Sequence, residues 1–175
     1  NKPTFIPILT IFTSMFMHGG WMHFLGNMLY LWIFADNVED IMGRKKFFFF
    51  YLSSGVFAAI LQASINIEST IPMVGASGAI AGILGSYLYV YPKAKILVLI
   101  PFIIFFTIRI PAYILLVFWF FLQFYNFGLS GSISSVAWLA HIGGFIFGYF
   151  YSVLTIKKKK KGKSLFAKKN NGPWN

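Results

Sequence analysis

The sequence predicts an all-α polytopic membrane protein, a helical bundle with about five spans and one interfacial or re-entrant segment. Three observations lead to this fold class. Of the 175 residues, 58% are hydrophobic and only 11% are charged, and the mean hydropathy is +0.71. Long apolar stretches recur through most of the chain, whereas a soluble domain of this length has a far more charged surface. Basic residues gather in short segments beside these stretches, as in the cytoplasmic loops of membrane proteins.

Five apolar segments are predicted to span the membrane, and they are 20–35, 47–65, 76–91, 112–127 and 133–156. The segments that join them alternate in charge. Basic residues follow the first span at 44–46, the third span at 93–95 and the fifth span in a lysine-rich tail. If these three segments are cytoplasmic, thirteen of the fifteen Lys and Arg residues lie inside, as the positive-inside rule expects.

The apolar segment 96–108 does not fit as a sixth span. A helix needs about 20 residues to cross a hydrocarbon core of about 30 Å, and this segment is shorter. It also contains Pro101 and is followed by Arg109 and Pro111. A sixth span here would move the lysine tail to the outside. We therefore expect an interfacial or re-entrant segment.

The chain divides into a transmembrane domain, 1–156, and a basic tail, 157–175, expected to be disordered and cytoplasmic. The tail is expected to contact anionic lipid headgroups. Because the charge of +11 lies in loops beside spans and in this tail, nucleic-acid binding is not expected. The absence of cysteine excludes disulfides and thiolate metal sites. The first residue is Asn1, which favours an N-terminally truncated or processed chain.

Strongly polar side chains in spans are costly and are therefore candidates for function. All three histidines, His18, His23 and His141, lie in or at the edge of predicted spans. His23 and Asn27 are four residues apart, which places them on one face of a helix. Each of these residues alone is compatible with a simple hydrogen bond between helices. Ser77 alone is also compatible with a seam of small residues.

The combination is more specific, because glycines link the polar residues. Two pairs of glycines, each four residues apart, follow Ser77 and His141, and they are Gly78, Gly82, Gly144 and Gly148. Small residues at this spacing let two helix backbones approach closely. If the two seams pack together, Ser77 and His141 come near hydrogen-bonding distance. The chemistry then expected is a nucleophile and its base.

No carboxylate is expected beside this pair, because the acids in the first span lie at its cytoplasmic end. The most that the chain offers is therefore a Ser–His dyad, with His23 and Asn27 as donors to a developing oxyanion. A zinc site on the three histidines is the rival interpretation. It leaves Ser77 without a role, and the sequence lacks HExxH. We predict neither a metal nor a cofactor.

Three blocks of the sequence resemble the rhomboid intramembrane serine proteases, particularly the bacterial type. The block "HGGWMHFLGN" has the family's HxxxxHxxxN pattern, "GASGAIAG" matches its GxSG nucleophile motif, and "AHIGGFIFG" matches AHxxGxxxG. The likeness extends from about residue 8 to 156, with the motifs in the family's order and spacing.

The resemblance implies a rhomboid-like bundle in which Ser77 is the nucleophile and His141 is its base. It implies an oxyanion hole formed by His23, Asn27 and the Ser77 backbone N–H, with His18 and Gly75 in supporting roles. The four glycines of the two seams are implied to support the site as well. The implied substrates are transmembrane proteins, cut near their outer ends. The implied location is a bacterial cytoplasmic membrane, with the C-terminus inside.

Two features depart from the family pattern. The family core has six spans, and this chain is expected to begin after the first of them. Some members have a tyrosine four residues after the nucleophile that packs on the histidine, but Ala81 is found here. Another group must then orient the imidazole, and Phe145 is one candidate. The alternative functions are a catalytically inactive relative that binds membrane helices, and a channel or transporter, which predicts charged residues in the spans.

Overall fold

The computed structural model describes residues 7–65, 73–99, 106–130 and 136–157. Within these ranges the chain is mainly helical. The elements in order are α1 (Pro7–Ser14), α2 (Trp21–Met42), α3 (Arg44–Ile65), α4 (Ser77–Val90), β1 (Lys95–Leu99), β2 (Thr107–Pro111), α5 (Ala112–Ser130) and α6 (Trp138–Thr155). Helices α2 to α6 fall on the five segments predicted as spans. Helix α1 is not among the predicted elements, and the predicted tail lies, apart from Lys157, outside the described residues.

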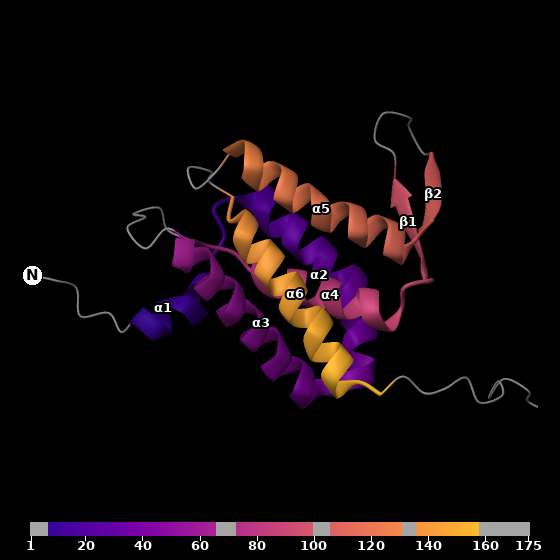
Figure 1. The fold of residues 1–175 in the computed structure, drawn as a ribbon, viewed down its shortest axis with the longest axis horizontal. Coiled ribbons are helices and arrows are strands. Elements are labelled where there is room, and N and C mark those ends of the chain that lie inside the picture. The colour runs from indigo at the N-terminus through magenta and orange to yellow at the C-terminus, as the bar shows by residue number, and fades with distance from the viewer. Residues whose placement is uncertain (1–6, 66–72, 100–105, 131–135, 158–175) are drawn as a thin grey trace, which may run out of the picture.

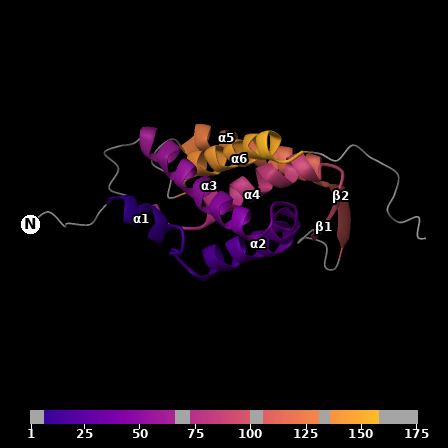
Figure 2. The same ribbon diagram turned by 90° about the horizontal axis from the view of Figure 1, so that it is seen from below.

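Helix α4 lies at the centre of the bundle. Figures 1 and 2 show it between α2 on one side and α6 on the other, and α3 and α5 also contact it. Every residue from Gly78 to Tyr87 is buried. A helix that is apolar all round is stable only when neighbours cover all its faces. The burial of α4 therefore explains why a helix of only 14 residues has a place in this fold.

Helices α4 and α6 pack with their backbones in close contact along the glycine seams that the sequence predicts. A Cβ atom at Gly148 would collide with the Gly82 carbonyl group, and one at Gly144 would collide with the Gly78 carbonyl. Such an approach is possible only where neither helix has a side chain at the crossing. The two helices run in the same direction, so their N-terminal ends lie side by side.

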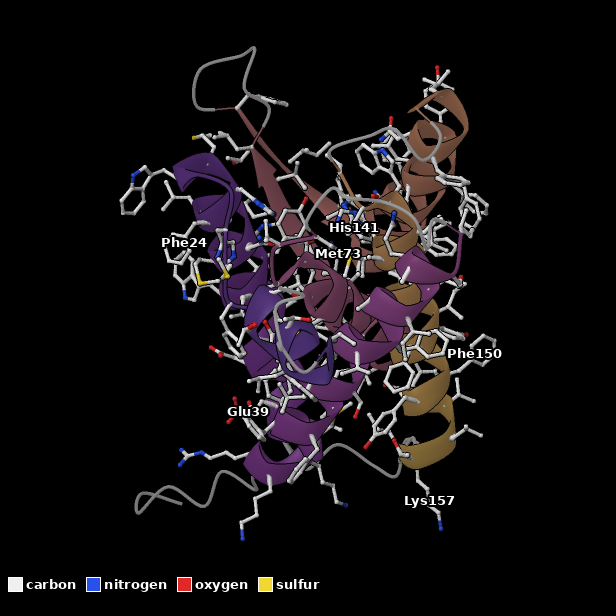
Figure 3. All side chains as sticks on the ribbon, turned by 90° about the vertical axis from the view of Figure 1, so that its left-hand side faces the viewer. Phe24, Glu39, Met73, His141, Phe150 and Lys157 are labelled. Carbon is white, nitrogen blue, oxygen red and sulfur yellow. The ribbon has the colours of Figure 1, made fainter. Side chains whose placement is uncertain are left out.

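Within the part of the chain that the structure describes, three helices are long and apolar enough to cross a membrane, namely α3, residues 112–129 of α5, and α6. Their large apolar side chains project outward as a lipid-facing surface requires, with Phe118 66% and Leu154 83% exposed. Helix α2 has 22 residues but carries Asp36, Glu39 and Asp40 near its C-terminal end. Figure 3 shows Glu39 and Lys157 at the end of the molecule away from His141.

The segment 96–108, expected to be interfacial or re-entrant, contributes to a β-hairpin rather than to a helix. Strands β1 and β2 pair antiparallel, with Ile96 opposite Ile110 and Leu97 opposite Arg109. Branched aliphatic residues favour a strand, and prolines disfavour a helix here. Ile96 is buried against the bundle core, which ties the hairpin to the cytoplasmic ends predicted for α4 and α5.

Candidate active site

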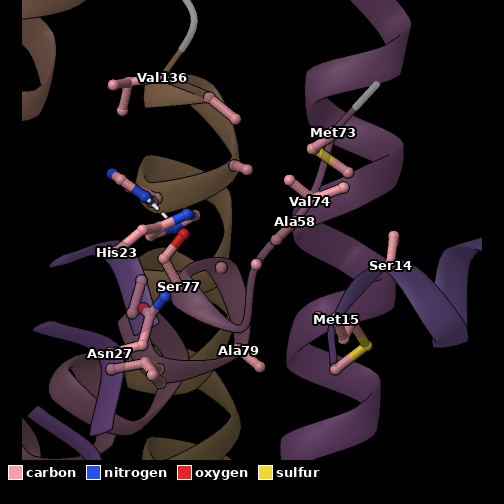
Figure 4. A pocket seen from close by; sticks show the side chains of 18 of the residues that line it. Ser14, Met15, His23, Asn27, Ala58, Met73, Val74, Ser77, Ala79 and Val136 are labelled. Carbon is pink, nitrogen blue, oxygen red and sulfur yellow. Dashed lines mark hydrogen bonds between the residues drawn. The ribbon is translucent and has the colours of Figure 1, made fainter. Parts of the chain in front are cut away.

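Ser77 and His141 meet at the N-terminal ends of α4 and α6. Ser77 is the first residue of α4, and His141 is in the first turn of α6. The Nε2 atom of His141 lies 2.9 Å from Oγ of Ser77, although the residues are 64 positions apart. The close contact of the two helix backbones at the glycine seams brings these side chains together. Figure 4 shows Ser77 facing the cavity at this end of the bundle.

The first turn of α4 also presents backbone donors to the site. The residue before Ser77 is Ala76, and no side chain caps this helix end. The first N–H groups of a helix have no partner within the helix, and the helix dipole makes this end attractive to negative charge. The backbone N–H of Ser77 is therefore a candidate donor to an anion that forms beside its own side chain.

His23 and Asn27 approach the same place from α2. Gly75, two residues before Ser77, has φ of +124°, a conformation that favours glycine. A Cβ at Gly75 would lie 2.7 Å from His23 Cε1 and 3.7 Å from Asn27 Nδ2, so both side chains lie against this short segment. Figure 4 shows both residues on the same side of the cavity as Ser77.

The amide of Asn27 carries a buried N–H donor that faces the candidate site. Asn27 is only 7% exposed, and its Nδ2 atom has no hydrogen-bond partner among the described residues. An unpaired buried donor typically costs about 1–3 kcal/mol, so it is uncommon in a folded protein without a function. This donor is available to a ligand in the cavity.

His18 packs behind His23 and does not face Ser77 directly. Its ring meets the ring of His23 edge to face at 5.3 Å and that of Phe24 at 5.2 Å. Together with Met15 and Phe24 it also lines a second hollow of about 360 Å³. The structure therefore places His18 in contact with the His23 ring.

A cavity of about 1140 Å³ connects these groups, and its wall includes Ser14, His23, Asn27, Met73, Ser77 and His141. It is large enough for an extended segment of polypeptide. Figure 4 shows Ser14, Met15 and Met73 across the cavity from His23 and Asn27. The cavity thus combines a hydroxyl bonded to an imidazole, several N–H donors and space for a substrate. Acyl transfer requires this set of groups.

The residues that contact the His141 imidazole were not predicted from the sequence. Nδ1 of His141 lies 2.9 Å from Oε1 of Gln123, a residue of α5 that is 3% exposed. Trp119 lies against the imidazole at 5.9 Å, and Trp138 meets it edge to face at 6.0 Å. Phe145, the candidate for this role, stacks instead on Phe120 at 4.6 Å. A glutamine within a predicted apolar span was the only signal of these contacts in the sequence.

The comparisons with known proteins agree on one family. The family model described as Rhomboid domain matches residues 7–158. Rhomboid protein 1, mitochondrial, of Saccharomyces cerevisiae is 29% identical over 159 residues, which are 87% of this chain and 43% of that protein. Rhomboid protease GluP of Bacillus subtilis is 32% identical over 140 residues, 80% of this chain and 24% of that protein.

A third relative is Presenilin-associated rhomboid-like protein A, mitochondrial, of Danio rerio. It is 33% identical over 100 residues, which are 55% of this chain and 26% of that protein. The chain thus spans less than half the length of each of these three relatives. Because the family model covers most of the chain, and its helices are those of an integral membrane protein, the chain belongs to the rhomboid family.

Proposed function

We propose that the protein is an intramembrane serine endopeptidase that cleaves transmembrane proteins with a Ser77–His141 dyad. The observation that carries this proposal is the 2.9 Å contact between Ser77 Oγ and His141 Nε2 at the cavity. A serine hydroxyl becomes a nucleophile when a neighbouring base can take its proton. The family supports the same class of chemistry, since GluP is named a rhomboid protease.

In the proposed reaction, Ser77 Oγ attacks the carbonyl carbon of the scissile peptide while His141 Nε2 takes the hydroxyl proton. The oxyanion then accepts hydrogen bonds from the Ser77 backbone N–H, His23 and Asn27. His141 returns the proton to the leaving amine, and an ester remains on Ser77. A water molecule, activated by the same imidazole, hydrolyses this ester and restores the hydroxyl.

The proposed substrates are transmembrane proteins cut near their outer ends. The candidate site lies at the end of the bundle opposite Glu39 and Lys157 (Figure 3). Basic residues near membrane spans favour the cytoplasmic side, and this assigns the site to the outer half of the membrane. In the proposed reaction, an unwound segment of the substrate lies in the cavity and presents a peptide bond to Ser77.

The test is covalent labelling with a fluorophosphonate in membranes that contain the chain, followed by cleavage of a transmembrane reporter. Ser77→Ala is expected to abolish both signals and to leave the melting temperature nearly unchanged, because it removes a single half-buried oxygen. Ser64→Ala is the matched control. Its hydroxyl is exposed and donates to the Leu61 carbonyl at 2.8 Å, so both signals should persist.

The possible results separate the proposed function from its alternative. Labelling that persists in Ser77→Ala would assign the reactive hydroxyl to another residue. A folded wild-type chain that neither labels nor cleaves would contradict the protease, and would favour a relative that binds membrane helices without cutting them.

A further inference from the structure

We propose that Gln123 is a positioning residue that holds the imidazole of His141 in the tautomer with its proton on Nδ1. This inference rests on the proposed function, because it assigns Gln123 a part in the same dyad. It begins from an unusual side chain in α5. Gln123 is 3% exposed, while its neighbours Leu122 and Phe124 are exposed on the outside of the bundle. An amide buried in an apolar span is costly unless both of its ends are hydrogen-bonded.

Both ends of the Gln123 amide have a partner. Its Nε2 group donates to the backbone carbonyl of Trp119 at 2.8 Å, one helical turn earlier. Its Oε1 atom lies 2.9 Å from Nδ1 of His141. A carbonyl oxygen only accepts hydrogen bonds, so the Trp119 carbonyl requires the NH₂ group of the glutamine on its side. The opposite orientation of the amide would place two oxygens against each other and lose that bond.

The orientation of the amide decides the position of the proton on His141. Because Oε1 of Gln123 only accepts, Nδ1 of the imidazole must donate and therefore carries the hydrogen. A neutral imidazole has one N–H and one bare nitrogen, so Nε2 is left with a free lone pair. That lone pair faces Ser77 Oγ at 2.9 Å. The hydroxyl donates to it, which is the arrangement that a general base needs before attack.

The hydrogen bond between His141 and Gln123 persists through the proposed reaction. Once Nε2 has taken the serine proton, the ring is charged and still donates from Nδ1 to Gln123. A hydrogen bond from a charged donor is stronger than one from a neutral donor. Gln123 thus stabilises the charged imidazole in its position beside Ser77. Trp119, on the same face of α5, packs on the imidazole at 5.9 Å and restricts its tilt.

The variants that test this inference are Gln123→Leu, which removes the acceptor with little change in volume, and Gln123→Glu, whose neutral acid keeps an accepting oxygen toward Nδ1 and an O–H donor toward the Trp119 carbonyl. The matched control is Gln62→Leu. Gln62 accepts from the backbone N–H of Ala140 at 3.2 Å and so contacts α6 beside His141 without contacting the ring.

Two measurements are made on each variant. The first is the tautomer of His141, from nitrogen NMR of protein labelled in its histidine rings, with the signal assigned by its loss in His141→Asn. The second is kcat and KM for reporter cleavage. Gln123→Leu is expected to convert the single Nδ1–H form into a mixture and to lower kcat about 10²-fold with KM nearly constant. Gln123→Glu is expected to keep the Nδ1–H form and recover most of kcat, and Gln62→Leu to leave the tautomer unchanged.

The proposal is overturned if Gln123→Leu retains the Nδ1–H form, whatever happens to kcat. It is also overturned if Gln123→Glu and Gln123→Leu lose the same activity, since a merely structural role makes no distinction between them. The tautomer measurement needs no catalysis. A wild-type protein that has the Nδ1–H form, lost in Gln123→Leu, but does not cleave would therefore refute the protease and support the positioning of His141.

Discussion

Helices α4 and α6 are joined by a side-chain hydrogen bond at each end of their contact, and the two bonds differ in their surroundings. At the N-terminal end, His141 Nε2 lies 2.9 Å from Ser77 Oγ beside a large cavity. Toward the C-terminal end, the hydroxyl of Ser152 donates to that of Ser86 at 2.7 Å, and both serines are 0% exposed. The same two helices, held by the same glycine seams, carry both bonds.

The difference indicates what a polar pair in a membrane protein needs in order to act as the proposed dyad. A hydroxyl bonded to a hydroxyl has no base to remove its proton, and the Ser86 and Ser152 side chains are both fully buried. The Ser77–His141 pair has a base, nearby N–H donors and a cavity. A serine in a span is therefore not itself a sign of catalysis. A catalytic serine is distinguished from a structural one by the partner of its hydroxyl and by the access of a substrate to that hydroxyl.

The largest effect is expected from a substitution that disrupts both hydrogen bonds between α4 and α6. Gly148→Val places methyl groups against the Gly82 carbonyl and forces the two helices apart. Overpacking against a backbone leaves nothing flexible to yield, so we expect a loss of about 3 kcal/mol or more in the free energy of unfolding. Thermal unfolding in detergent and fluorophosphonate labelling measure the two consequences, a lower melting temperature and no labelled protein.

The control for this seam is Gly128→Val on α5. A Cβ at Gly128 meets nothing within 4 Å, so this variant should unfold and label like the wild type. If Gly148→Val retained the wild-type melting temperature, the helices would not be in backbone contact, and the glycines would not explain how Ser77 reaches His141.

The next largest effect is a loss of activity without a loss of stability. Asn27→Ala removes a proposed oxyanion donor and is expected to lower kcat about 10²–10³-fold, with KM little changed. The melting temperature should be at least as high as in the wild type, because the variant removes a buried Nδ2 group that has no partner among the described residues. Asn37→Ala, an exposed position on the same helix, is the control for kcat. A large loss of stability in Asn27→Ala would make Asn27 a structural residue.

Sequence patterns predicted the helical bundle, and they named the candidate residues near the N-terminal ends of α2, α4 and α6. Apolar periodicity locates the five helices, and glycines four residues apart indicate which helices approach. Gln123 offers no such pattern. Its contact with His141 depends on how α5 is placed against α6, and apolar composition does not specify that placement. The β-hairpin was not predicted for a similar reason, because apolar composition does not distinguish two short strands from a short helix.

The smallest expected effect concerns the buried Ser86–Ser152 contact between α4 and α6. Ser152→Ala leaves the buried hydroxyl of Ser86 without its donor, and we expect a loss of about 1–3 kcal/mol in the free energy of unfolding. Cleavage of the reporter should stay within about twofold of the wild type, because the chemistry of the proposed dyad is at the other end. Ser86→Ala should behave in the same way.

The double variant Ser86→Ala/Ser152→Ala makes this prediction specific. Replacing both partners removes both desolvated hydroxyls, so the double variant should be no less stable than either single one. Chemical unfolding of the four proteins measures the coupling, and a sum of two independent losses would show that the bond at 2.7 Å is not what holds these serines. At the other end, Ser77→Ala and His141→Ala should each abolish cleavage at little cost in stability. In the same pair of helices, substitutions at Ser86 and Ser152 would then lower stability, and substitutions at Ser77 and His141 would abolish activity.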